Sequence, residues 1–429
     1  MRRHVIKSLM NGRVSMRPMN TVLRNRIRSV TLGAVALFLV LSLILYPEQA
    51  FQSSLKGLKI WWDVVFPALL PFFIASEILM GFGVVHFLGV LLEPMMRPLF
   101  RVPGVGAFVM AMGLASGYPI GAKLTARLRE QKLISRTEGE RLVSFTNTAD
   151  PLFMFGAVAV GFFHDVSLGV SLAVAHYSSS LLLGFLMRFH EPKGAATPSP
   201  KEDSTFFLWR ALQAMHRARL SDGRSLGQLM GDAISSSVNT LMGIGGFIIM
   251  FSVIIDVLTQ VGITGIFAAA VGFLFKGIGL PEELAPSVIA GLFEITLGAQ
   301  VASQVPITVH MAYKMAVTGA IIAWSGFSVH AQVASILSRT DIRYTPYCVA
   351  RFIHALFAGS ITLLIWEPVG RYLLTSDAAV PAFLRQIPEA GWAGFPERVQ
   401  YLGWRALLLL GTLMLAALGI RAIRRLLLR

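Results

Sequence analysis

The sequence predicts an all-α, polytopic membrane protein built from two inverted repeats, each containing a re-entrant helical hairpin. Hydrophobic residues make up 55% of the 429 residues and charged residues only 14%, and the mean hydropathy is +0.65. Several apolar runs are long enough to cross a hydrocarbon core, which takes about 20 helical residues. In addition, broken apolar segments recur along the chain at a constant spacing, which indicates an internal repeat.

About eight apolar runs are expected to be transmembrane helices. The runs lack the period-2 alternation of a membrane β-barrel, and charged loops separate them. The first run follows a basic segment as a signal peptide would, but its length favours an uncleaved span. The expected spans are 30–46, 63–84, 140–163, 166–188, 230–258, 307–337, 345–366 and 404–423.

The formal charge of +15 is distributed in a way that indicates membrane orientation. Eight basic residues and no acidic residue lie within 1–28, so the N-terminus is expected in the cytoplasm, where Lys and Arg accumulate beside membrane spans. The C-terminus, with Arg421, Arg424, Arg425 and Arg429, is expected there too. No basic domain with interleaved aromatic residues is evident, so no nucleic-acid partner is expected. The partner expected from composition is the lipid bilayer of the cell membrane.

These features divide the chain into seven parts. A polar segment rich in Pro and in charged residues separates two apolar halves, which are the predicted repeats. The expected parts are a cytoplasmic basic N-terminus (1–29), a first transmembrane helix and connector (30–59), repeat 1 (60–188) with a hairpin near 104–124, a cytoplasmic linker (189–225), repeat 2 (226–366) with a hairpin near 284–304, an extracytoplasmic segment (367–403), and a last transmembrane helix with a basic tail (404–429).

The two hairpins are expected because Gly, Pro and polar residues interrupt the apolar segments 104–124 and 284–304. Such backbone is tolerated at membrane depth only inside protein or beside a wet cavity. The motifs that begin at Gly113 and Gly291 lie 178 residues apart. Basic residues surround the first hairpin but not the second, so the hairpins are expected to enter from opposite sides, as in secondary transporters. The alternative is that both segments are ordinary packed spans.

The predicted site lies at the two hairpin tips. Ser116, Gly117 and Tyr118 form the first break, where unpaired backbone N–H groups and a helix N-terminus suit an anionic group. In the second hairpin, Glu294 lies within an apolar run close to Thr296. A carboxylate at membrane depth costs about 2.5–3.5 kcal/mol, so a function or a partner is expected.

The spans that follow the hairpins have polar centres, which are also expected to bind solute. Asn147 and Thr148 lie in the first span, and Ser325 and Ser328 lie in the second, with Asn147 and Ser325 again 178 residues apart. Such polar residues also serve as glue between helices, and this alternative stays open for each of them.

Three ionisable residues are candidates for ion coupling, namely Asp150, Glu294 and Lys123. Lys123 could equally reach the cytoplasmic surface through its long stem. The coupling ion is left open between a proton and sodium. Further intramembrane ionisable groups, including His176, Arg351 and His354, are expected to be packing or interfacial groups.

No catalytic residues, metal site or cofactor are expected. Cys348 is the single cysteine, so neither an intramolecular disulfide nor a cysteine-based metal cluster can form. The phosphate-binding, zinc-protease and nucleophile-elbow motifs are absent from the sequence. The sequence therefore favours a carrier over an enzyme or an ATP-driven pump. The oligomeric state is left open, with a homo-oligomer among the options.

At these residues the chain resembles the YlbJ family of sporulation integral membrane proteins, which carry two Gate (nucleoside recognition) domains. The matching stretches are 113–158 and 291–303. The resemblance implies a fold similar to concentrative nucleoside transporters, with repeats 1 and 2 as Gate repeats. It also implies transport of dipicolinate from the mother cell across the outer forespore membrane during spore maturation. Asp150 departs from the family, which usually has a small or amide residue there.

Three functions follow from this sequence. The first is a carrier for a small anionic solute, with dipicolinate as the implied substrate. The second is a carrier for a nucleoside or another polar metabolite. The third, from a different class, is a membrane scaffold that recruits sporulation proteins without transporting anything.

Overall fold

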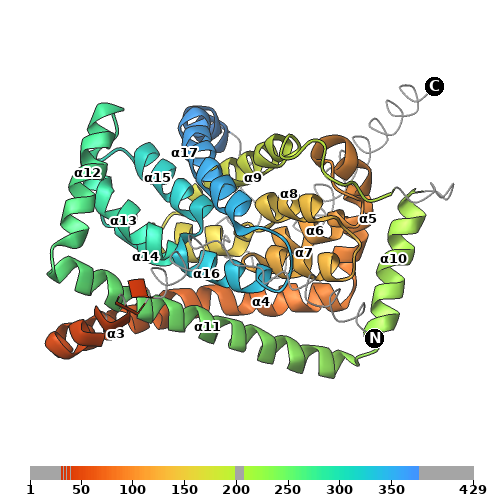
Figure 1. The fold of residues 1–429 in the computed structure, drawn as a ribbon, viewed down its shortest axis with the longest axis horizontal. Helices are drawn as coiled ribbons and strands as arrows, with labels where there is room; N and C mark the ends of the chain where they lie inside the picture. Colours follow the sequence, from red (N-terminus) through yellow and green to blue (C-terminus); the bar gives the residue numbers. More distant parts are fainter. Residues whose placement is uncertain (1–29, 32, 35, 39, 199–206, 376–429) are drawn as a thin grey trace, which may run out of the picture.

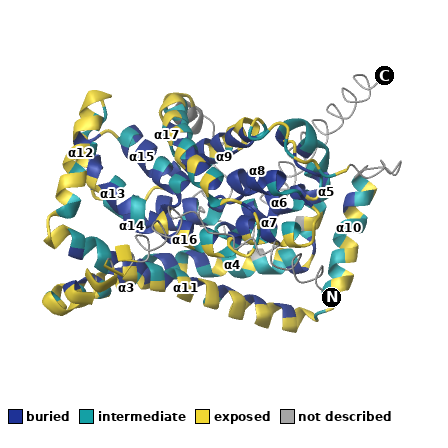
Figure 2. Ribbon diagram, viewed as in Figure 1, coloured by how far each residue is buried: buried dark blue, intermediate teal, exposed yellow. Residues whose placement is uncertain are grey.

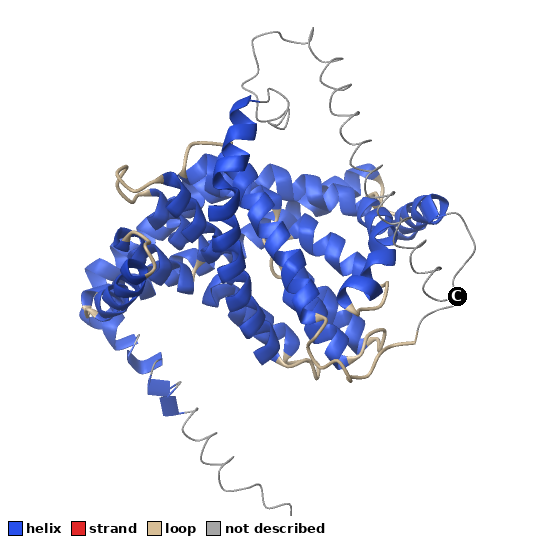
Figure 3. Ribbon diagram, turned by 90° about the horizontal axis from the view of Figure 1, so that it is seen from above, coloured by secondary structure: helices blue, strands red, loops and turns tan. Residues whose placement is uncertain are grey.

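The computed structural model describes residues 30–31, 33–34, 36–38, 40–198 and 207–375, and the described residues contain helices but no strand (Figures 1 and 3). The basic N-terminus 1–29, residues 376–403 of the extracytoplasmic segment, the span 404–423 and the basic tail lie outside the described residues.

Helices of the first half follow the order of a long helix, a short helix, a hairpin and a broken helix. The long helix comprises α3, η1 and α4, and runs without interruption through a π-helical stretch. The elements are α3 (Pro47–Ile60), η1 (Trp61–Val65), α4 (Phe66–Gly81), α5 (Val84–Met95), η2 (Met96–Phe100), α6 (Gly106–Ser116), α7 (Ile120–Glu130), α8 (Arg136–Thr146), η3 (Phe153–Phe162) and α9 (Leu168–Met187).

The second half repeats this order. A helix within the predicted linker precedes it, so that part of the linker is structured. The elements are α10 (Phe207–Asp222), α11 (Leu226–Gln260), α12 (Ile263–Gly277), η4 (Glu282–Leu284), α13 (Ala285–Phe293), α14 (Ile295–Ser303), α15 (Met311–Trp324), α16 (Gly326–Leu337) and α17 (Tyr344–Thr375).

The two halves correspond element by element. The helix pair α6–α7 matches the pair α13–α14, and α8 followed by η3 matches α15 followed by α16. In Figure 1, α12 and α13 lie at one end of the bundle and α5 and α10 lie at the other, while α8, α14 and α16 lie between them. The hairpins thus approach the centre from opposite ends. Their entry from opposite sides of a lipid bilayer stays a prediction.

Five helices among the described residues are long and apolar enough to cross a membrane. They are Pro47–Gly81, Leu168–Met187, Leu226–Gln260, Met311–Leu337 and Tyr344–Pro368. Ala36–Leu45, in the predicted first span, is a shorter apolar helix. The chain is therefore a polytopic, all-helical membrane protein.

Two of the expected continuous spans are broken. The span predicted at 140–163 stops at Thr146 and resumes after Asp150, and the span predicted at 307–337 is interrupted at Ser325. The expectation that Asn147 and Thr148 lie within a continuous helix is therefore wrong, because the helix has ended before Asn147. Apolar periodicity does not reveal such a break when both sides are helical.

Burial concentrates where the broken elements meet. In Figure 2 the buried residues gather in α6, α8, α14 and α15, whereas α12 and much of α11 are exposed. Within α8, every residue from Thr137 to Thr146 is buried. A capping box starts this helix, since the Ser135 hydroxyl accepts from the Glu138 backbone N–H (3.2 Å) and the Glu138 carboxylate accepts from the Ser135 N–H (2.8 Å). The broken helices are therefore the core of the protein, and the long helices surround them.

Candidate functional site

The tip of the first hairpin is Gly117, whose backbone dihedrals (φ 68°, ψ −161°) are open essentially only to glycine. Two further glycines let the hairpin fit against the end of α8. A Cβ on Gly113 would lie 1.9 Å from the Thr146 carbonyl oxygen, and a Cβ on Gly121 would lie 2.4 Å from the same atom. The Gly residues at the hairpin therefore fix how closely the first hairpin approaches the first break.

The first break is the extended segment between Thr146 and Pro151, and side chains satisfy its backbone. Asn147 links the segment to both halves, because its Oδ1 accepts from the Ala122 N–H (3.3 Å) and its Nδ2 donates to the Tyr347 hydroxyl (2.9 Å). Asp150 then caps the next helix by accepting from the Phe153 N–H (2.8 Å). An N-cap of this kind places a carboxylate at the positive end of a helix.

The tip of the second hairpin is Glu294, which is extended (φ −149°, ψ 128°) and separates α13 from α14. Its carboxylate accepts from the Leu297 N–H (2.9 Å) and from the Thr296 hydroxyl (3.2 Å). Glu294 is therefore the N-cap of α14, just as Asp150 is the N-cap in the first half. Both Asp150 and Glu294 are buried, with 5% of each residue exposed.

The second break lies at Ser325 and Gly326, which both have positive φ (75° and 69°). A Cβ on Gly326 would lie 3.0 Å from the Phe293 carbonyl oxygen. The break therefore packs directly against the tip of the second hairpin, as the first break packs against the first hairpin.

The two repeats meet through Tyr118. Its hydroxyl donates to the Ile322 carbonyl (2.9 Å), one turn before the second break. The first hairpin tip is thereby joined to the discontinuous helix of the other repeat.

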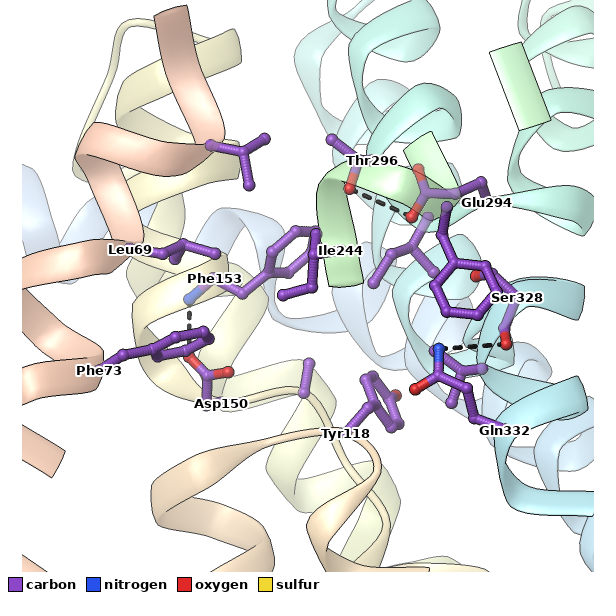
Figure 4. A pocket seen from close by; sticks show the side chains of 15 residues that line it. Leu69, Phe73, Tyr118, Asp150, Phe153, Ile244, Glu294, Thr296, Ser328 and Gln332 are labelled. Carbon is purple, nitrogen blue, oxygen red and sulfur yellow. Dashed lines mark hydrogen bonds between the residues drawn. The ribbon is translucent and has the colours of Figure 1, made fainter. Parts of the chain in front are cut away.

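Between these elements lies a cavity of about 80 Å³, several times the space that one water needs. Figure 4 shows Asp150 on one side of the cavity and Glu294 on the other, with Tyr118 below and Phe73 and Phe153 on the left. The lining residues are Val65, Leu69, Phe73, Tyr118, Ala149, Asp150, Phe153, Ile244, Phe247, Glu294, Ile295, Thr296, Ser328, Val329 and Gln332.

The lining combines aromatic and aliphatic walls with a few polar groups, the usual composition of a small-molecule site. Thr296, Ser328 and Gln332 supply neutral polar groups, and the Gln332 amide donates to the Ser328 carbonyl (3.2 Å). Within the part of the chain that the structure describes, the cavity lining contains two carboxylates and no Lys, Arg or His. The net charge of the lining is therefore negative when both carboxylates are ionised, and it is neutral when protons or cations are bound to them.

The structure brings together five of the residues that the sequence singled out, since Tyr118, Asp150, Glu294, Thr296 and Ser328 all line this cavity.

The other predicted residues lie outside the cavity lining. Gly117 lies beside the Asp150 carboxylate, and Asn147, Thr148 and Ser325 are buried in the breaks. Ser116 faces α4, where its hydroxyl lies 3.8 Å from the Met80 sulfur. Lys123 is exposed, as expected for a side chain that reaches a membrane surface.

Sequence reasoning missed the apolar wall of the cavity. Phe73 comes from α4 and Ile244 and Phe247 come from α11, and no local motif distinguishes these residues from ordinary lipid-facing or core positions. Gln332 is not among the missed residues, because it lies one turn after Ser328 and belongs to the same polar stripe of the sequence.

At the end of the bundle where the first hairpin begins, an ion-pair cluster joins the two repeats. Arg343, just before α17, contacts Glu140 in α8 (2.7 Å) and Glu191 in the linker. A second pair joins Arg129 in α7 to Asp341 (2.7 Å). We call these residues together the inter-repeat ion-pair cluster.

This cluster also contains a group of potential metal ligands, because ligand atoms of Glu140, His190 and Glu191 all lie within 4.8 Å of one another. The carboxylates already face Arg343 and Arg136. Hydrogen bonds from the Thr137 hydroxyl and then from Arg343 lower the pKa of Glu191 to about 2. The arrangement is therefore explained by ion pairing without a metal.

Comparison with known proteins defines the class of the protein first. Residues 62–189 match the family described as Gate: Nucleoside recognition, which corresponds to the first repeat. The fold and this match describe a helical, multi-pass membrane protein with a Gate domain, and they indicate no enzyme family.

A curated relative then identifies the family. The chain is 48% identical over 346 residues to "Sporulation integral membrane protein YlbJ" of Bacillus subtilis (strain 168), and the alignment covers 80% of this chain and 84% of the relative. The chain therefore belongs to the YlbJ family of sporulation integral membrane proteins. No solved structure matches it.

Proposed function

We propose that the protein is an alternating-access carrier that moves a small polar solute together with protons or sodium ions through the cavity between the two hairpin tips. The observation that carries this proposal is the location of the cavity, between two broken helical elements from two repeats. In secondary transporters, solute and coupling-ion sites lie where discontinuous helices of two repeats meet.

The two carboxylates define the coupling chemistry. Asp150 and Glu294 each face the cavity from the start of a helix. Two carboxylates at membrane depth are costly unless they are protonated or bind cations. A solute that carries negative charge would enter this cavity only with protons or cations on Asp150 and Glu294, so transport of an anion would be cation-coupled.

Dipicolinate is the solute that we propose. It is small, flat and aromatic, which suits the walls formed by Tyr118, Phe73 and Phe153. Membership of a sporulation family supports a role during spore formation, and we place the carrier in the outer forespore membrane on that ground. The proposed flow is from the mother cell toward the spore.

A nucleoside is the second candidate solute. The Gate family description names nucleoside recognition, and the lack of Lys, Arg or His in the lining favours a neutral solute with hydroxyl donors. Thr296, Ser328 and Gln332 would bind such a solute through neutral hydrogen bonds. A scaffold function without transport is the remaining alternative.

The test is solute flux into vesicles that contain the purified protein. Radiolabelled dipicolinate is supplied outside, with and without an inward proton or sodium gradient, and uridine is used in parallel. We expect dipicolinate uptake that a gradient accelerates. Uridine uptake without dipicolinate uptake would overturn the substrate, and a lack of flux for both solutes would favour the scaffold.

A further inference from the structure

The helix α17 carries four polar side chains at positions that share one face. Tyr344, Tyr347, Arg351 and His354 follow one another at spacings of three or four residues. Tyr347, Arg351 and His354 are fully buried, and α17 is one of the helices long enough to span a membrane. A buried guanidinium in such a helix is costly, so its contacts must compensate for the lost hydration.

Arg351 contacts the first break. One of its terminal nitrogens donates to the Asn147 carbonyl (2.9 Å) and the other donates to the Ser144 carbonyl. These carbonyls belong to the end of α8, where the last four C=O groups have no partner within the helix. The guanidinium therefore supplies two of the missing donors and a positive charge at the negative end of the helix dipole.

The neighbours of Arg351 on α17 contact the same break. The Tyr347 hydroxyl accepts from the Asn147 amide (2.9 Å). The His354 Nε2 lies 3.1 Å from the His176 carbonyl, and the His176 Nε2 lies 3.3 Å from the Ala149 nitrogen, so that it accepts from that N–H. Residues Ser144 to Ala149 are thus held by one face of α17, directly or through His176.

The start of α17 reaches the second break. The Tyr344 hydroxyl lies 2.6 Å from Nδ1 of His330, and Nε2 of His330 lies 3.0 Å from the Trp324 carbonyl. Trp324 is the last residue of α15, immediately before the break at Ser325. A single helix therefore holds the breaks of both repeats.

We infer that α17 sets the geometry of the solute site and that Arg351 is a positioning residue, because it fixes the end of α8 and the start of the first break, which carries Asp150 into the cavity. Asp150 follows Asn147 by three residues and itself lines the cavity. Arg351 is not a cavity-lining residue, so it acts on the solute through the residues that it holds. This inference rests on the proposed function, because it concerns binding of the carried solute.

The test compares the concentration dependence of uptake for Arg351→Gln, Arg351→Lys and the unchanged protein in the same vesicles. We expect Arg351→Gln to raise KM by roughly tenfold or more with a smaller change in Vmax per reconstituted molecule, because misplaced site groups weaken binding. Lysine keeps the positive charge but lacks the planar guanidinium that donates to two carbonyls at once. Arg351→Lys is therefore expected to give an intermediate KM. The exposed Arg339 provides the control variant Arg339→Gln, which should keep KM unchanged.

An unchanged KM in Arg351→Gln would overturn the inference, as would a loss in Vmax alone, which a merely structural role predicts. If Arg351→Gln does not reach the membrane, Tyr347→Phe tests the inference instead, because it deletes one hydroxyl and keeps the ring. We expect this variant to raise KM several-fold, and an unchanged KM would contradict the role of α17 in setting the geometry of the solute site. Absence of flux in the unchanged protein is a different result, since it would reject the proposed function itself.

Discussion

A Cβ atom on Gly117 would lie 2.4 Å from the Asp150 Oδ2 atom. The tip of the first hairpin and the carboxylate at the first break therefore fit together only because residue 117 has no side chain. Among the described residues, this contact links a predicted re-entrant element directly to a charged group of the cavity.

Gly117→Ala is expected to reduce transport without removing the protein from the membrane. The substitution strains a backbone conformation that costs about 1–3 kcal/mol for residues other than glycine, and it displaces the Asp150 carboxylate. Uptake per reconstituted molecule should fall about tenfold or more, because that energy corresponds to such a factor in rate. Gly227→Ala is the matched control, since a Cβ there meets nothing within 4 Å. Equal uptake by both variants would show that the contact does not matter.

Gly113→Ala is expected to lower the stability of the folded protein. The added methyl group would lie 1.9 Å from the Thr146 carbonyl oxygen, so the hairpin and α8 must separate. Overpacking of this kind typically costs about 1–3 kcal/mol. Thermal unfolding in detergent measures the effect, with Gly246→Ala as a control at an open position. A melting temperature equal to that of the control would contradict the packing described for the first hairpin.

The positions of the two hairpin tips could be predicted from local sequence, whereas the breaks within the following spans could not. Gly117 and Glu294 interrupt apolar runs, and the spacing of 178 residues relates Asn147 to Ser325. These signals are local, because a helix that must stop inside the membrane needs Gly, Pro or a capping side chain at that point. The prediction of unbroken spans failed because the residues on both sides of each break are good helix formers.

The contacts that join distant segments could not be predicted in the same way. The sequence predicts a packing or interfacial role for Arg351 but not its partners, which are the carbonyls of Asn147 and Ser144. Ile244 and Phe247 line the cavity from a helix whose sequence resembles any apolar span. Contacts of this kind depend on how helices pack, and helical periodicity carries no information about the partner.

Asp150→Asn is expected to uncouple transport from the cation gradient. Asparagine keeps the volume and can accept from the Phe153 N–H, but it carries no titratable charge. Gradient-driven accumulation should be lost, while exchange of labelled for unlabelled solute continues. Asp165→Asn, in an exposed loop, serves as the control. If Asp150→Asn accumulates solute at the normal rate, a group other than the Asp150 carboxylate couples transport to the cation gradient.

The inter-repeat ion-pair cluster is expected to lose its stabilising effect in acid. Hydrogen bonds from Thr137 and Arg343 lower the pKa of Glu191 from 4.5 to about 2, and hydrogen bonding to Arg129 lowers the pKa of Asp341. A lowered pKa in the folded state stabilises the protein above the unfolded-state value, and this stabilisation is lost as the pH falls through the folded-state value. For Glu191 the loss occurs between pH 4.5 and about 2.

Glu191→Gln tests this prediction through melting temperatures measured from about pH 7 to about pH 2.5. The variant should be less stable than the unchanged protein at neutral pH, and the difference should shrink below about pH 4.5. High salt should also reduce the difference, because the pair is partly exposed. A difference that stays constant over the whole pH range would mean that the carboxylate charge of Glu191 contributes nothing.

The most direct measurement is the accessibility of the cavity to water-soluble thiol reagents. Cys348 is first replaced by serine, and single cysteines then replace Thr296 or Ser328, which line the cavity, or Ala299, which is buried outside its lining. We expect labelling at the first two positions, slowed by the transported solute, and none at the third. If Thr296 and Ser328 resist every reagent from both sides of the membrane, with or without solute, no hydrated pathway reaches the hairpin tips and the carrier mechanism is contradicted.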